Sequence, residues 1–261
     1  MKKIGVVGLG LIGGSICKTL GPLGYEIVAV SNSMQGILPN ITADYNTLKD
    51  CDVVFVCSAM NKAMEVLDTL EHVLSQDTIV TDVCSLKTFV CRKERPYIFI
   101  PSHPMAGTEH KGFENSFEGL FNGAKWVITP CFAVPKEART TLENIIKDMG
   151  AEPVITTPKE HDEAVALISH MPMVVSQALF LAASDNKLAL DIASSGFRDM
   201  TRLAMSNEEM ACDMVSMNAE NIQNAILKLY KSLGELTDKN YAEMISKIKS
   251  QRENMFNVHL S

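Results

Sequence analysis

The segment Gly8-Leu9-Gly10-Leu11-Ile12-Gly13 fits the pattern G-x-G-x-x-G, and it lies between a β-branched run at residues 4–7 and a helical pattern at residues 11–20. In this pattern the first glycine permits a tight turn, the second lets a pyrophosphate approach the backbone, and the third allows close packing of helix on strand. The phosphates would lie at the helix N-terminus, where free N–H groups favour an anion. The segment therefore predicts a dinucleotide-binding unit in which all six residues contact the cofactor.

Strand and helix signals alternate through the first part of the chain. Buried-strand patterns occur at residues 4–7, 26–30, 53–57, 78–81, 97–100, 126–129 and 153–156, and helical patterns at 11–20, 62–74 and 135–149. Continuous apolar runs suit a sheet that is covered on both faces. The alternation predicts an α/β fold of Rossmann type, with a doubly wound and mostly parallel sheet, which we place at residues 1–157.

The strand signal disappears after Pro158. Helical periodicity follows at residues 161–183, 187–194, 208–233 and 241–255, which predicts an all-helical second domain over residues 158–261. A small helical domain has limited core of its own, so we expect it to bury apolar residues against a second copy of the chain. The predicted assembly is a homodimer formed through this domain.

The amino-acid composition limits the expected binding partners and the expected cellular compartment. The chain has 261 residues and a formal net charge of −7, without a long block of Lys or Arg, so nucleic acid is not an expected partner. The seven cysteines are odd in number and lack C-x-x-C spacing, which predicts the reducing cytoplasm and no metal site. We find no run near the ~20 apolar residues of a membrane span, and expect no membrane association.

The choice between NAD and NADP normally depends on the residue that follows the second strand. Here that strand ends in Ser31-Asn32-Ser33, which offers neither a carboxylate for a ribose hydroxyl nor an arginine for a 2'-phosphate. Because no carboxylate would repel the 2'-phosphate, the prediction favours NADP slightly, and NAD remains an alternative. We expect Ser31, Asn32 and Ser58 to contact the cofactor, and the link to Asp52 looks too short for a full crossover helix.

Four further motifs follow the fingerprint in a fixed order. They are Thr81-Asp82-Val83-Cys84-Ser85-Leu86-Lys87, Ser102-His103-Pro104-Met105-Ala106-Gly107-Thr108-Glu109, Ile168-Ser169-His170-Met171-Pro172 and Ser195-Gly196-Phe197-Arg198-Asp199-Met200-Thr201-Arg202. In this combination the chain resembles the prephenate and arogenate dehydrogenases of tyrosine biosynthesis. The resemblance covers nearly the whole chain and corresponds to the minimal form, without chorismate mutase or regulatory domains.

The resemblance implies an NAD(P)-dependent oxidative decarboxylation. Hydride leaves the ring carbon that bears the hydroxyl, the ring carboxylate departs as carbon dioxide, and the ring becomes aromatic. This chemistry needs a base near the hydroxyl, and histidine titrates near neutral pH. His103 matches the family's catalytic histidine, and Ser85 matches the serine that orients the hydroxyl.

Four residues are candidates for substrate binding. Arg202 matches the family arginine that holds a carboxylate, a task suited to a planar guanidinium. His170 is either a substrate contact or a satisfied core histidine, and Thr108 either touches substrate or shapes its loop. Asp162 could select arogenate by binding the ammonium group of that substrate, although a favourable charge in the first turn of a helix is the simpler interpretation.

Two other functions fit parts of the pattern. A β-hydroxyacid dehydrogenase or imine reductase would share a Rossmann domain followed by a helical domain, but typically uses a lysine or lacks the Ser-His-Pro loop. A nucleotide-sensing protein could keep the fold without turnover, because a fold does not fix a function. The joint presence of Ser85, His103 and Arg202 speaks against a sensor.

Overall fold

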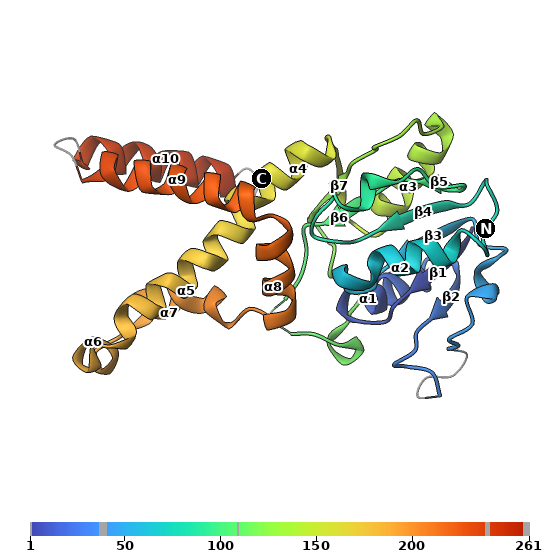
Figure 1. Ribbon diagram of the computed structural model, residues 1–261, viewed down its shortest axis with the longest axis horizontal. Helices are drawn as coiled ribbons and strands as arrows, with labels where there is room; N and C mark the ends of the chain where they lie inside the picture. Colours follow the sequence, from blue (N-terminus) through green and yellow to red (C-terminus); the bar gives the residue numbers. More distant parts are fainter. Residues whose placement is uncertain (1, 37–40, 109, 238–240, 258–261) are drawn as a thin grey trace.

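The computed structural model describes residues 2–36, 41–108, 110–237 and 241–257. Glu109, named above, lies outside these ranges. Figure 1 shows the strands together with helices α1, α2 and α3 in the first part of the chain. These elements are β1 (Lys3–Val7), α1 (Leu11–Leu20), β2 (Glu26–Val30), β3 (Val53–Val56), α2 (Met60–Leu70), β4 (Ile79–Asp82), β5 (Ile98–Phe99), β6 (Ser102–Pro104), β7 (Lys125–Ile128), α3 (Lys136–Asp148) and β8 (Glu152–Ile155).

Five strands form a parallel sheet in the order β2-β1-β3-β4-β5. The chain crosses from β2 over β1 to β3, and the described part of this link holds one short 3-10 helix, η1 (Tyr45–Leu48). This agrees with the short link expected from the sequence. The carboxyl ends of β1 and β3 lie side by side where the crossover direction changes, which is where open α/β sheets bind ligands.

The predicted doubly wound, mostly parallel sheet is confirmed, and the remaining strands form a second, smaller sheet in the order β6-β7-β8. β6 was not predicted, because Ser-His-Pro carries no strand pattern. It pairs antiparallel with β7, with His103 opposite Val127. Ile100 and Pro101 separate β5 from β6, and His103 pairs in the second sheet and not in the parallel one.

Both faces of the parallel sheet are covered, as the continuous apolar runs predict. Alternate residues of β3 point to opposite faces: Val54 and Val56 pack with α2, whereas Val53 and Phe55 pack with α1 and α3. The α2 side of the core also includes residues of the helical half, Val165, Met173, Ala211 and Met214. The two halves therefore share one apolar core.

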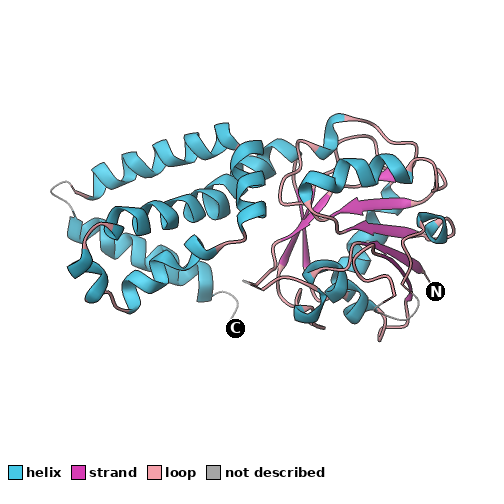
Figure 2. Cartoon of the chain, turned by 60° about the horizontal axis from the view of Figure 1, so that its bottom comes forward, coloured by secondary structure: helices cyan, strands magenta, loops and turns pink. Residues whose placement is uncertain are grey.

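The second half of the chain is helical (Figure 2). It comprises α4 (Pro158–Val165), a π-helical turn (Ala166–His170), α5 (Met171–Ser184), α6 (Lys187–Asp191), α7 (Ser195–Thr201), η5 (Arg202–Met205), α8 (Glu208–Met217), α9 (Ala219–Leu236) and α10 (Tyr241–Asn257). The single helix expected at residues 208–233 is divided at Asn218, whose φ of −121° and ψ of 25° leave the helical region.

The helical half has little core of its own. One separate cluster contains only Ala166, Ile222 and Ala225 as buried apolar residues. Large apolar side chains are exposed along α5 to α10, including Leu181, Leu188, Ile192, Met205, Leu227 and Tyr230. In Figure 1 these helices extend away from the sheets as an arm. Contiguous exposed apolar surface of this kind is typical of interaction sites.

The run Pro158–Ser184 forms 27 residues of continuous helix, and its length and composition would allow it to cross a membrane. The expectation that no run approaches such a span is therefore wrong by composition. Three of the buried polar residues in this run, His161, Asp162 and His170, form side-chain hydrogen bonds. Their engagement with the nucleotide-binding half and with Asn218 favours a domain helix over a membrane span.

Candidate active site

The three glycines of the fingerprint meet three different steric demands. Gly8 has a φ of +93°, and a Cβ there would lie 2.8 Å from the Cys57 carbonyl oxygen. A Cβ on Gly13 would lie 2.0 Å from the Gly8 carbonyl oxygen, so the third glycine allows the turn to pack on helix α1. A Cβ on Gly10 would meet nothing within 4 Å. Gly10 is also the N-cap of α1, so the open space lies where a phosphate would bind.

Ser58 lies beside this turn, because the position of a Cβ on Gly8 is 3.1 Å from the Ser58 backbone nitrogen. The Ser58 hydroxyl is buried and has no hydrogen-bond partner among the residues that the structure describes. A buried hydroxyl without a partner is costly unless a ligand satisfies it. The turn, the helix N-terminus and this hydroxyl together fit a dinucleotide.

The end of β2 offers little that would discriminate between the two nicotinamide cofactors. Ser31 is buried, its N–H donates to the Thr42 carbonyl at 2.9 Å, and its hydroxyl lies 3.3 Å from that of Ser33. Asn32 is exposed. Residues 31–36 contain no arginine or lysine, so the lean towards NADP gains no support.

His103 is partly buried on β6 and contacts a second histidine. Its Nδ1 lies 2.9 Å from Nε2 of His161, and the two rings meet edge to face. Nδ1 of His161 in turn lies 2.8 Å from Oδ1 of Asp162. Burial, followed by the charges of His161, Lys87 and His170, holds the pKa of His103 well below its usual range. At neutral pH His103 is therefore an uncharged imidazole, the form that accepts a proton.

Asp162 connects the two halves of the chain. Its carboxylate accepts the backbone N–H of Lys87 at 2.8 Å and that of Thr88 at 2.9 Å, in addition to His161. Burial raises the pKa of Asp162, but the hydrogen bonds from His161, Thr88 and Lys87 outweigh it and lower the pKa. The charge is thus retained in a site where the side chain is buried.

The interpretation of Asp162 as a first-turn charge of its own helix is wrong. Helix α4 begins at Pro158, and its N-terminus is capped by Thr157 and Glu160 in a capping box. Asp162 lies one turn further on and points at the loop after β4. The pair His161-Asp162 was visible in the sequence. Only the fold places β6, which carries His103, beside this pair.

Lys87 is a further residue of the site that the sequence did not single out. Its side chain is 0% exposed, as is that of its ion-pair partner Asp82, and its Nζ donates to the Ser102 carbonyl oxygen at 2.6 Å. Ser102 also bonds through its hydroxyl to Thr81 at 2.7 Å and accepts from Trp126 Nε1 at 2.9 Å. The residue before His103 is thus held on every side.

His170 lies in the same region, at the end of the π-helical turn, and is 1% exposed. Its Nδ1 lies 3.2 Å from the side-chain nitrogen of Asn218, which also donates to the Asp162 carbonyl oxygen at 3.0 Å. Burial lowers the pKa of His170 to about 4, and the charge of Asp162 offsets only part of this effect. His170 is an uncharged polar group fixed from one side.

Three other predicted residues stand apart from this network. Ser85 is partly buried in the loop after β4, and its hydroxyl has no hydrogen-bond partner within the described ranges. Thr108 is exposed, and its hydroxyl bonds to the backbone of His110, at 3.2 and 3.3 Å, as a loop-shaping residue would. Arg202 is exposed at the start of η5, and the described part of the chain supplies no partner for its guanidinium.

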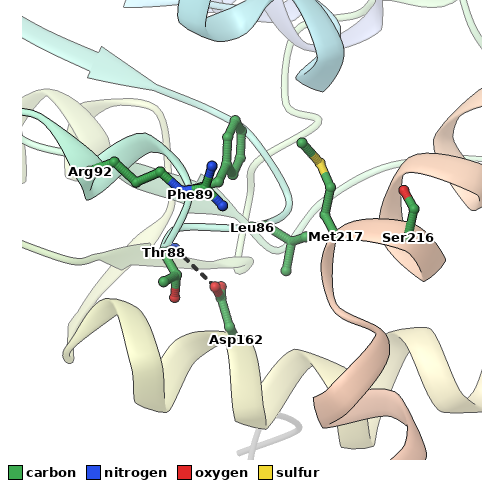
Figure 3. A pocket seen from close by; sticks show the side chains of 7 residues that line it. All are labelled: Leu86, Thr88, Phe89, Arg92, Asp162, Ser216 and Met217. Carbon is green, nitrogen blue, oxygen red and sulfur yellow. Dashed lines mark hydrogen bonds between the residues drawn. The ribbon is translucent and has the colours of Figure 1, made fainter.

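A cavity of about 310 Å³ lies next to Asp162 and is bounded by the segment after β4 and the end of α8 (Figure 3). Figure 3 shows Thr88 bonded to Asp162 on one side, with Met217 and Ser216 of α8 facing it across the opening. Neither His103 nor Ser85 lines this cavity. We therefore describe it as a neighbour of the network and not as the substrate site.

Comparisons with known proteins identify the two halves of the chain. Residues 24–155 match the family model for the prephenate dehydrogenase nucleotide-binding domain, and residues 157–259 match that for the prephenate dehydrogenase dimerization domain. A prephenate dehydrogenase of Bacillus subtilis is 30% identical over 238 residues, which are 83% of this chain and 64% of that protein. The chain therefore spans less than two thirds of that relative.

Two solved structures are similar along almost the whole chain. The arogenate dehydrogenase of Synechocystis has a TM-score of 0.79 and 32% identity, covering 99% of this chain and 96% of that one. The prephenate dehydrogenase of A. aeolicus, solved in complex with hydroxyphenyl propionate and NAD+, has a TM-score of 0.86 and 27% identity, with 98% of each chain covered. The division into a nucleotide-binding half and a helical half is common to these proteins.

Proposed function

Because the chain belongs to the prephenate dehydrogenase family, we propose that it catalyses the oxidative decarboxylation of prephenate to 4-hydroxyphenylpyruvate, or of arogenate to tyrosine. The observation that carries the proposal is the buried pairing of His103 with His161, 2.9 Å apart, beside an ionised Asp162. An uncharged, oriented histidine is the base that this chemistry requires.

In the proposed reaction, His103 takes the proton from the ring hydroxyl while Ser85 orients that oxygen. NAD(P), when bound at the turn of residues 8–13, supplies the hydride acceptor. Arg202 binds a carboxylate of the substrate, and its exposed guanidinium, which has no partner among the residues that the structure describes, supplies positive charge in a chain of net charge −7. His170 completes the site as an uncharged polar contact. Loss of the ring carboxylate as carbon dioxide makes the ring aromatic.

The preference between the two substrates depends on whether the site holds an ammonium group. Asp162 was the acidic residue considered for that purpose, but three donors from the protein already bind its carboxylate. A carboxylate committed in this way is a weak acceptor for a further cation, and this favours prephenate. For the cofactor we retain NAD or NADP.

We further propose that the protein is a cytoplasmic homodimer that contacts neither nucleic acid nor membrane. The family model over residues 157–259 is that of a dimerization domain, and the same helices expose the large apolar residues described above. A second copy covering these faces would supply the core that the helical half lacks. The odd number of unpaired cysteines suits a reducing compartment.

The test is an assay of the purified protein in a two-by-two matrix of prephenate or arogenate with NAD or NADP, following reduced nicotinamide by its absorbance. We expect turnover in at least one combination, and loss of that signal in the His103→Asn variant. Silence in all four combinations, with cofactor binding intact, would reject the proposal and favour a nucleotide-sensing protein.

A further inference from the structure

The hydrogen bonds around His161 determine where its proton lies. An ionised carboxylate can only accept hydrogen bonds, so the contact of Asp162 Oδ1 with His161 Nδ1, at 2.8 Å, requires the proton on Nδ1. His161 is only 2% exposed, and Asp162 already shares its charge with two backbone N–H groups. In a neutral imidazole one ring nitrogen carries the proton and the other carries a lone pair. His161 Nε2 therefore carries a lone pair.

The same reasoning extends to His103. Its Nδ1 lies 2.9 Å from the His161 Nε2 lone pair, so this bond requires a donor on His103. The proton of the neutral His103 ring then lies on Nδ1, and its Nε2 is left with a lone pair. Nε2 is the ring atom that is not bonded to His161, and it is free to take a proton from a ligand.

We propose that Asp162 and His161 are positioning residues that fix His103 in the tautomer with an unprotonated Nε2. The proposal rests on the proposed function, in which His103 is the base, and adds how the base is held ready. When the substrate O–H bond breaks and an N–H bond forms at His103 Nε2, the imidazolium keeps its Nδ1–H bond to His161. Asp162 lies at the far end of this hydrogen-bonded series and stabilises the positive charge.

The hydrogen-bonded series of His103, His161 and Asp162 also connects the two halves of the molecule. His103 belongs to β6, whereas His161 and Asp162 belong to α4. Asp162 holds the backbone of Lys87 and Thr88, and Asn218 holds the Asp162 carbonyl. The base is therefore oriented only when the helical half is seated against the loop after β4.

The first test measures the tautomer directly and requires no substrate. Histidine labelled with ¹⁵N distinguishes the two tautomers, because protonated and unprotonated ring nitrogens have widely separated chemical shifts. We expect His103, assigned by its absence in His103→Asn, to show Nδ1–H and an unprotonated Nε2 near neutral pH. A proton on Nε2 and none on Nδ1 would overturn the proposal, since it would mean that His161 donates to His103.

The second test uses three substitutions of one residue. Glutamine places its amide near Nε2 of histidine and can still accept from His103, whereas asparagine places its amide near Nδ1 and can reach only Asp162. Phenylalanine removes both contacts and leaves Asp162 bonded to the loop. We expect His161→Phe and His161→Asn to lower kcat by roughly 10²-fold with KM little changed. We expect His161→Gln to retain a higher kcat than these two variants.

The control is His72→Phe, an equivalent change at an exposed histidine after helix α2. Its kcat and the His103 spectrum should match those of the unmodified protein. Equal activity of His161→Phe and the unmodified protein would reject the positioning role. An equal decrease of kcat in the Gln, Asn and Phe variants would also reject the positioning role, because the decrease would then follow from lost packing alone. If the protein shows no dehydrogenase turnover, the proposed function fails while the tautomer measurement still decides this inference.

Discussion

The ammonium nitrogen of Lys87 lies 2.6 Å from the carbonyl oxygen of Ser102, the residue that precedes His103. Lys87 also forms an ion pair with Asp82, and both side chains are 0% exposed. One buried cation thus ties the end of β4 to the strand that carries the proposed base. The loop that contains Ser85 begins and ends at these two charged residues, so its position depends on the same ion pair.

Removing one partner of this pair should be strongly destabilising. In Lys87→Met the Asp82 carboxylate would remain buried without its counter-ion, and we expect a loss of about 3–5 kcal/mol in the free energy of unfolding by urea. The matched control is Lys62→Met, in an exposed pair with Glu65, with an expected change below about 1 kcal/mol. The double variant Lys87→Met/Asp82→Leu should recover part of the loss. Similar losses for both lysines would contradict this view.

The fingerprint glycines should separate binding from folding. A Cβ on Gly10 meets nothing within 4 Å, so Gly10→Ala should keep its melting temperature while weakening the binding of NADH or NADPH by roughly tenfold or more. A Cβ on Gly13 lies 2.0 Å from a backbone oxygen, so Gly13→Ala should melt at a lower temperature. Fluorescence titration and thermal melting measure the two effects. Unchanged cofactor affinity in Gly10→Ala would argue against phosphate binding at the start of α1.

Arg202 should act on substrate binding more than on turnover. Lysine keeps the charge but loses the bidentate geometry, so Arg202→Lys should raise KM by roughly tenfold with a smaller change in kcat. Arg198→Lys is the control, because Arg198 is exposed and forms only a 3.8 Å contact with its neighbour Asp199. Steady-state kinetics with the preferred substrate decides, and an unchanged KM in Arg202→Lys would remove the residue from the site.

His170 should make stability depend on pH in a defined window. Its pKa is about 4 in the folded chain and near 6.5 in the unfolded one, so the unfolded state binds the proton more readily between these values. Its contribution is complete above pH 6.5 and is lost as the pH falls towards 4, by on the order of 3 kcal/mol. His103, whose pKa is also lowered, acts in the same direction.

The measurement is the free energy of unfolding by urea at several pH values. His170→Asn keeps an acceptor for Asn218 but no titratable ring, so its stability should fall less steeply over this window. Parallel curves for the two proteins would show that His170 does not titrate on unfolding.

The helical half should be the source of dimerisation. Leu181 on α5 and Leu227 on α9 are 72% and 65% exposed, and glutamate at both positions should yield a monomer in sedimentation velocity. Leu23→Glu is the control, because Leu23 is also exposed but lies between α1 and β2. A monomer before any substitution would reject the proposed assembly.

The sequence by itself determined the local structure and the kind of chemistry. Helix α1 has the predicted bounds, and the seven predicted strands are present within one or two residues, because glycines, prolines and apolar runs act over short distances. The motif around His103 indicated the family, which the comparisons confirm. The role of each named side chain remains a prediction.

Only the tertiary structure decided which of these residues act together. His103 and His161 are 58 positions apart in the sequence, and no periodicity relates them, yet Nδ1 of His103 lies 2.9 Å from Nε2 of His161. Asp162 became a link between domains, and Lys87 a buried cation, because the loop after β4 packs against α4. Hydrogen bonds between distant segments depend on how elements dock, whereas local pattern records only which face of each element is apolar.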